Sequence, residues 1–118
     1  MSKNKSLGDQ GEEIAVNELE KQGYTIVDRN FRKKYGEIDI IAKKGDTVAF
    51  VEVKTRVNTS MGLPREAVNL KKQNRIKNTA MAYIAENQLY DTNFRFDVAE
   101  VMVLNDTVYF NYIENAFY

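Results

Sequence analysis

Two short segments of the chain place charged side chains inside apolar, strand-like runs. Residues 36–39 include Glu37 and Asp39 and lead into an apolar stretch, and Glu52 and Lys54 interrupt a second one. Because strand side chains alternate between two faces, the members of each pair should point the same way. A buried charge costs several kcal/mol unless it is paired or bound to a metal ion. Three carboxylates and one ammonium group on neighbouring strands therefore need a common explanation.

The composition limits the chemistry that these residues can do. The chain has no His and no Cys, which removes the commonest general base, the commonest zinc ligand and any thiolate. Catalysis is left to carboxylates, Lys, Tyr, hydroxyl groups, or a hard metal ion held by oxygen atoms. We interpret the four charged residues as a Mg²⁺ or Mn²⁺ site for hydrolysis of phosphodiester bonds. The alternative is an ordinary ion pair between Glu52 and Lys54, with Glu37 and Asp39 on a solvent-facing strand edge.

The charges are segregated along the chain. Residues 29–77 hold thirteen Lys or Arg and five Asp or Glu, a net charge of +8, against −3 for residues 1–28 and −5 for residues 78–118. A basic surface around a few carboxylates suits a phosphate-backbone binder, although solvated faces that mix in three dimensions remain an alternative. The candidate nucleic-acid contacts are Arg32, Lys33, Lys34, Arg56, Lys71, Lys72 and Arg75.

An amphipathic helix is expected near the start of the chain. Ser6 is a good N-cap, and the helix should run to about Gln22 and stop at Gly23. Glu12 falls inside the apolar arc of this helix, so it should either face the body of the protein or extend its carboxylate to solvent.

The remaining chain predicts five strands and one further helix. The strands are expected over residues 24–30, 37–43, 47–55, 95–103 and 107–113, with hairpin turns at 44–46 and 105–106. Asn69 should cap a helix over about 70–87, and the polar loop 56–64 could form a flap beside the site. The order α-β-β-β-α-β-β predicts an α/β or α+β three-layer domain around a mixed sheet, without fixing the strand order.

A set of short motifs occurs in order along the chain: Gly8-x-x-Gly11-Glu12, Gly23-Tyr24, Arg29-Asn30, Gly36-Glu37-Ile38-Asp39, Phe50-Val51-Glu52-Val53-Lys54-Thr55-Arg56, Ala67-Val68, Arg95-Phe96-Asp97-Val98 and Asn115-Ala116-Phe117. The spacing from Asp39 to Glu52-Val53-Lys54 resembles the signature of the PD-(D/E)xK nuclease superfamily. Over about residue 7 to the end, the whole set resembles the YraN-like family of bacterial proteins, which is considered a distant relative of archaeal Holliday-junction resolvases within that superfamily.

The resemblance implies a fold, an activity and a set of site residues. The fold is restriction-endonuclease-like, with a central mixed β-sheet of about five strands flanked by helices, and the activity is metal-dependent hydrolysis of DNA, including branched DNA such as Holliday junctions. Asp39 and Glu52 match metal ligands, with the Val53 carbonyl as a third. Lys54 matches the catalytic lysine. Glu12 matches the helix acid of the resolvases, which holds the metal directly or through water.

Two positions depart from the superfamily pattern. Ile38 stands where the superfamily name has Pro, at a position that varies widely. The Gln-x-x-x-Tyr helix motif of some superfamily nucleases is not matched, because Gln73 is followed at that spacing by Lys77. Gln73 is therefore only a weak site candidate, and Glu37 is a second weak candidate.

At the level of the whole chain, residues 1–118 are expected to form one domain, with residues 1–6 disordered. No signal segment or membrane span is seen, so a cytoplasmic location is expected. The nuclease resemblance implies DNA as the partner, and the resolvase relatives suggest a homodimer. Two alternatives stay open. One is a nucleic-acid-binding module without cleavage, and the other is an interaction protein whose exposed C-terminal apolar residues contact another subunit: Phe110, Tyr112, Ile113 and Phe117.

Overall fold

The computed structural model describes residues 6–57 and 68–118 of the protein. The elements follow the predicted order: α1 (Leu7–Lys21), β1 (Thr25–Lys33), β2 (Gly36–Lys44), β3 (Thr47–Arg56), α2 (Leu70–Glu86), β4 (Asn93–Leu104) and β5 (Thr107–Phe117). Of the expected flap at 56–64, the structure describes Arg56, which ends β3, and Val57, and the rest lies outside the described residues. Of residues 1–6, for which disorder is expected, only Ser6 is described, and it caps α1.

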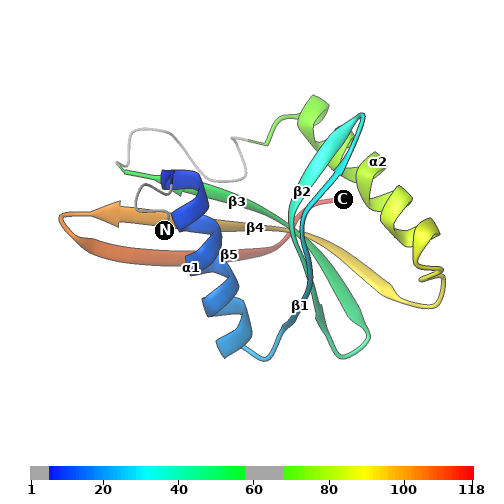
Figure 1. Cartoon of the computed structure of the whole chain (residues 1–118), viewed down its shortest axis with the longest axis horizontal. Coiled ribbons are helices and arrows are strands. Elements are labelled where there is room, and N and C mark those ends of the chain that lie inside the picture. The colour runs from blue at the N-terminus through cyan, green and yellow to red at the C-terminus, as the bar shows by residue number, and fades with distance from the viewer. Residues whose placement is uncertain (1–5, 58–67) are drawn as a thin grey trace, which may run out of the picture.

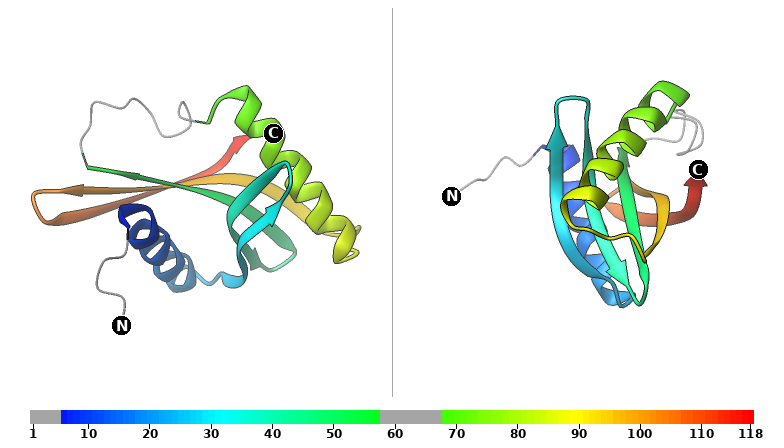
Figure 2. Two further views of the ribbon diagram at one scale, coloured as in Figure 1. Left: turned by 45° about the horizontal axis from the view of Figure 1, so that its top comes forward. Right: turned by 90° about the vertical axis from the view of Figure 1, so that its right-hand side faces the viewer.

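The five strands form one mixed sheet in the order β1-β2-β3-β4-β5 (Figure 1). All neighbouring pairs are antiparallel except β3 and β4, which are parallel. A parallel pair needs a long crossover connection, and this one contains α2. The helices cover opposite faces of the sheet (Figures 1 and 2), which confirms the expected three-layer, restriction-endonuclease-like arrangement. Neither helix of the described part is long and apolar enough to cross a membrane.

Alternation along β3 divides the core into two clusters. Phe50 belongs to the cluster beneath α2 together with Ile76, and this side of the sheet is called the α2 face. Val51 belongs to the cluster beneath α1 together with Ala15 and Leu19, on the α1 face. Since both sides of the central strand are buried, the register of β3 fixes which of its polar side chains face α2.

Local signals in the sequence define the helix starts and the tight turns. The Ser6 hydroxyl accepts a hydrogen bond from the Asp9 backbone N–H at 3.0 Å. The Asn69 side chain accepts one from Lys72 N–H at 2.9 Å. Asn105 and Asp106 both have positive φ, of 48° and 63°, as a two-residue hairpin turn requires. Both predicted caps and this predicted hairpin are confirmed.

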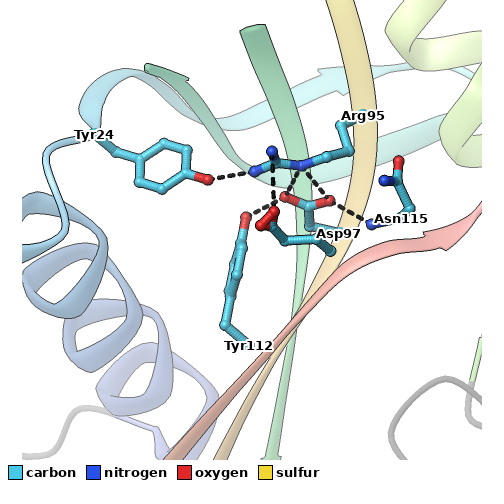
Figure 3. Close-up of polar contacts among 6 residues, drawn as sticks. Tyr24, Arg95, Asp97, Tyr112 and Asn115 are labelled. Carbon is cyan, nitrogen blue, oxygen red and sulfur yellow. Dashed lines mark hydrogen bonds and ion pairs between the residues drawn. The ribbon is translucent and has the colours of Figure 1, made fainter. Parts of the chain in front are cut away.

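Strand β5 runs four residues beyond the predicted end, and a buried polar network accounts for the extension (Figure 3). Asp97 is fully buried on β4 and accepts two 2.9 Å hydrogen bonds from Arg95 Nε. The Tyr112 hydroxyl donates to Asp97 at 2.5 Å, and the Asn115 backbone N–H donates at 3.0 Å. Arg95 also donates to the Tyr24 hydroxyl. The network holds the irregular end of β5, where Asn115 has a φ of 52°, against β4.

The C-terminal apolar residues are not an exposed surface, and that prediction is wrong. Phe117 is buried on the α2 face and stacks on Phe96 with ring centroids 5.3 Å apart. Phe110 and Tyr112 are partly buried against the cluster beneath α1, and Ile113 is half-buried. These residues cover the two faces of the sheet because the extended β5 pairs with β4 along most of its length.

Candidate functional site

The charged residues of β2 and β3 meet at a hollow of about 440 Å³ on the α2 face. Glu52 follows Val51 along β3 and therefore points toward α2, as does Lys54 two residues later. The hollow lies beside the start of α2, and its lining consists of Gly36, Glu37, Asp39, Glu52, Asn69, Lys71, Lys72, Arg75 and Ile76. The structure thus brings Asp39 and Glu52 together, as the sequence predicts.

Asp39 reaches the hollow because the β2–β3 ladder ends just before it. The last paired residues are Ile40 and Val51. Beyond them, the Asp39 carboxylate accepts a hydrogen bond from the backbone N–H of Val53 at 2.8 Å. The N–H and C=O of one strand residue point to the same edge, so the Val53 carbonyl is also directed toward the Asp39 side.

The two carboxylates occupy an environment that disfavours two negative charges. Burial and the neighbouring charge of Glu52 raise the pKa of Asp39 from the ordinary 3.8 to about 8. Within the described residues Asp39 has no ion pair, whereas Glu52 pairs with the ammonium groups of Lys72 and, at 3.5 Å, Lys54. Asp39 is therefore a half-buried carboxyl group without a cation of its own.

The two lysines at this site are shifted in opposite directions. Burial and the adjacent Lys72 lower the pKa of Lys54. Burial by itself would lower the pKa of Lys72 as well, but the hydrogen bond to Glu52 outweighs it and raises the pKa of Lys72 above the usual lysine value. Lys72 is thus firmly protonated, and Lys54 is the lysine closer to losing its proton.

Glu12, on α1, is the third acidic residue predicted for the site. It is half-buried, and burial raises its pKa although Arg29 opposes the shift. The charge of Glu12 contributes to the raised pKa of Asp39, so the two groups lie within electrostatic range. Gly11 lets α1 lie close to β3, because a Cβ atom there would overlap the side chain of Thr55 on β3.

The donor set suits a hard metal ion that keeps most of its water. No group of three or more His, Cys, Asp or Glu side chains in residues 6–57 and 68–118 converges closely enough to hold an ion. Mg²⁺ is commonly bound through one or two carboxylates and retains several waters. Asp39 and Glu52, with the Val53 carbonyl directed toward the same side, fit that requirement, and Glu12 lies within electrostatic range of Asp39.

Most of the predicted phosphate-binding residues line this hollow or a second one that shares residues with it. Lys71, Lys72 and Arg75 of α2 line it. Arg32, Lys33 and Lys34 line a second hollow that also contains Arg75.

Three of the predicted site residues have other contacts. Arg56 is buried, 3% exposed, and pairs with Glu100 at 3.1 Å, so the prediction that it contacts nucleic acid is wrong. The Gln73 side chain donates to the Val68 carbonyl at 2.9 Å and does not line the hollow. Glu37 does line it, but its carboxylate is held by Arg32 at 2.5 Å.

Glu100 is a buried carboxylate near the site that the sequence reasoning missed. The parallel register of β3 and β4 places it directly beside Lys54. The signal was available, because Glu100 interrupts an apolar strand just as Glu52 does. Its partners could not be recognised without the strand pairing, which is formed across a long crossover.

The fold and the site together define a restriction-endonuclease-like three-layer protein with an adjacent carboxylate pair and a lysine on its central strands. The family model described as "Uncharacterised protein family UPF0102" matches residues 11–101, and the chain belongs to this family, the YraN-like family that the motifs indicated. A UPF0102 protein of Alkaliphilus metalliredigens is 53% identical over 113 residues, which cover 96% of this chain and 98% of the relative.

Two further relatives give the same result. A UPF0102 protein of Clostridium acetobutylicum is 53% identical over 116 residues, covering 97% of this chain and 95% of the relative. A UPF0102 protein of Clostridioides difficile is 49% identical over 114 residues, covering 97% and 98%. These matches establish the family and specify no reaction.

Proposed function

We propose that the protein is a divalent-metal-dependent nuclease that hydrolyses phosphodiester bonds in DNA, branched DNA included. The observation that carries the proposal is the adjacent pair Asp39 and Glu52, which lies in a hollow bordered by basic side chains. Burial and Glu52 raise the pKa of Asp39 to about 8, and no lysine or arginine of the described residues forms an ion pair with Asp39. A bound Mg²⁺ or Mn²⁺ would supply positive charge beside Asp39, together with a water of lowered pKa and electrostatic stabilisation of the phosphate.

The residues of the chain have distinct roles in this proposal. Asp39 and Glu52 hold the ion from two adjacent strands. Lys54 lies beside Glu52, with a pKa lowered by burial and by Lys72, so it can orient a water or transfer a proton more readily than an exposed lysine. Lys71 and Arg75 line the same hollow and can neutralise the phosphates of the bound strand.

One observation favours a second function, a nucleic-acid-binding module without cleavage. Glu52 already accepts the ammonium groups of Lys72 and Lys54, so one of the two carboxylates is neutralised by the protein itself. Both ammonium groups contact the same carboxylate oxygen, Oε2, so a metal ion at Glu52 would have to share the carboxylate with two cations. A module of this kind would retain the basic border of the hollow and bind nucleic acid without a metal.

Cleavage of labelled DNA tests the nuclease. The substrates are a four-way junction, a flap, a duplex and a single strand, each incubated with Mg²⁺, with Mn²⁺ or with EDTA. We expect cleavage that requires metal and that is lost in Asp39→Asn, Glu52→Gln and Lys54→Met. The matched control is Asp106→Asn, because Asp106 is an exposed turn residue at which asparagine suits the positive φ.

The possible results separate the two functions. Metal-dependent cleavage that survives Asp39→Asn would show that the hydrolysis does not depend on this site. If none of these substrates is cut but the protein binds DNA with strong dependence on salt, the nuclease proposal fails and the binding module is supported.

A further inference from the structure

A second hollow, of about 540 Å³, adjoins the first. It lies where the turn between β1 and β2 reaches α2 (Figure 1), and its lining consists of Arg32, Lys33, Lys34, Tyr35, Gly36, Glu37 and Arg75. Gly36, Glu37 and Arg75 also line the hollow that holds Asp39 and Glu52. A ligand that occupies the carboxylate hollow can therefore continue directly into the second one.

The second hollow contains two cations that no acidic side chain of the described residues pairs with. Arg32 is paired with Glu37, and Lys33 with Glu86. Lys34 and Arg75 are exposed and have no ion pair within the described part of the chain. Arg75 lines both hollows, and Lys34 lines only the second. Two unpaired cations arranged in this way suit successive phosphates of one strand.

Tyr35 adds an aromatic surface to this basic hollow. It lies in the turn between β1 and β2, is 46% exposed, and makes no ring contact with another aromatic residue of the described chain. An accessible aromatic ring next to phosphate-binding cations is the arrangement by which proteins stack the bases of single-stranded nucleic acid. In a duplex the bases are already stacked on each other, so their flat faces are not available to such a ring.

The walls of the second hollow are held in place by close packing. A Cβ atom at Gly36 would lie 2.7 Å from the Thr79 hydroxyl and 3.1 Å from the Arg75 carbonyl, so the start of β2 lies directly on α2. Phe31 and Tyr83 add an edge-to-face contact between β1 and α2, with ring centroids 5.0 Å apart. A hollow fixed by packing costs little ordering free energy when a ligand binds.

We propose that the second hollow binds an unpaired nucleotide, with its base on Tyr35 and its phosphates on Arg75 and Lys34. The ligand class is single-stranded nucleic acid, or the single-stranded segment of a branched molecule. The inference rests on the proposed function only in assigning the neighbouring phosphate to the hollow of Asp39 and Glu52. Binding to the second hollow does not require cleavage.

The test measures binding without metal, so that it is independent of hydrolysis. Fluorescence anisotropy in EDTA compares the binding of two labelled ligands. One is a single-stranded oligothymidylate, and the other is the blunt duplex that this strand forms with oligodeoxyadenylate. We expect Tyr35→Leu to weaken single-strand binding about 5- to 100-fold, and Tyr35→Phe to retain it, because the ring and not the hydroxyl stacks. We expect Arg75→Gln to weaken binding and to reduce its salt dependence by about one phosphate contact. Lys77→Gln is the matched control, because Lys77 lies on the same helix and lines neither hollow.

A direct contact can be mapped in the same samples. Oligonucleotides that carry 5-iodouracil should crosslink to Tyr35 on irradiation, and mass spectrometry of the crosslinked peptide identifies the residue. The proposal is overturned if Tyr35→Leu binds the single strand as the unmodified protein does, or if the duplex binds at least as tightly. A protein that binds in this pattern but cuts no DNA would disprove the nuclease and leave this binding site intact.

Discussion

The raised pKa of Asp39 predicts that the metal-free protein becomes less stable as the pH rises toward 8. The folded protein holds this proton up to a pH of about 8, whereas the unfolded chain releases it near 3.8. The stabilising contribution is therefore complete below the unfolded value and is lost as the pH rises through the folded one. Asp39→Asn removes this titration and keeps an oxygen acceptor for the Val53 N–H.

The size of the effect follows from the one proton that separates the two states. One proton corresponds to a slope of about 1.4 kcal/mol per pH unit in the free energy of unfolding. Both pH 5.5 and pH 7.5 lie between the two pKa values. From the lower to the higher pH, the free energy of unfolding of the metal-free protein should fall by about 2–3 kcal/mol relative to that of Asp39→Asn.

Urea unfolding followed by circular dichroism, at several pH values in EDTA, measures this difference. Other groups titrate in both proteins, so the free energy of the unmodified protein minus that of Asp39→Asn isolates the contribution of Asp39. Asp106→Asn is again the matched control and should track the unmodified protein at every pH. A difference between the two proteins that does not change from pH 5.5 to 7.5 would refute the assignment of a protonated Asp39.

The same samples test the metal site, and two further stability predictions concern buried polar contacts. Mg²⁺ should stabilise the unmodified protein increasingly as the pH rises and leave Asp39→Asn unchanged, since an ion that binds only the folded state competes with the proton. Arg56→Met should destabilise the protein by about 3–5 kcal/mol, because it leaves Glu100 buried and unpaired, and the double variant with Glu100→Gln should recover part of the loss. Tyr112→Phe should cost about 1.5–3 kcal/mol, since it removes one donor to the buried carboxylate of Asp97. Urea unfolding measures all three, and a double variant at Arg56 and Glu100 that merely adds the two single losses would contradict the pairing.

The sequence predicts the parts of the site that depend on neighbours along the chain. Alternation along β3 places Glu52 and Lys54 on one face, and the motif spacing brings Asp39 to the same region. The helix cap at Asn69 is local in the same sense, since its partner is Lys72, three residues away. Each of these features depends on backbone periodicity within a single element or on a short, regular hairpin connection.

The features that could not be predicted depend on the parallel pairing of β3 with β4. Arg56 shares the face of Lys54, so alternation alone makes it a candidate phosphate contact. Strand β4, which lies beside Arg56, follows a long crossover in the sequence, and it supplies Glu100 as a buried partner. In the same way, the ion pair between Lys72 and Glu52 depends on how the start of α2 lies on β3.

The resemblance to a family does not separate catalytic residues from structural ones. The structure does separate them for Asp39 and Asp97, the two aspartates in the family motifs. Asp97 is fully buried on β4, yet both carboxylate oxygens accept hydrogen bonds, from Arg95, Tyr112 and the Asn115 N–H. Its charge is thus compensated within the protein. Asp39 accepts a hydrogen bond from the Val53 N–H, and the charge of its acidic neighbour Glu52 raises its pKa.

A carboxylate that folding alone leaves uncompensated is unfavourable unless something outside the chain supplies the missing positive charge. The difference between the two aspartates therefore gives Asp97 a structural role and makes Asp39 the stronger candidate to bind a cation. It also predicts opposite responses to the same substitution. Asp97→Asn should destabilise the protein at neutral pH because it weakens a satisfied network, whereas Asp39→Asn should stabilise the metal-free protein. If both substitutions destabilise it equally at pH 7.5, the reasoning that separates the two residues is wrong.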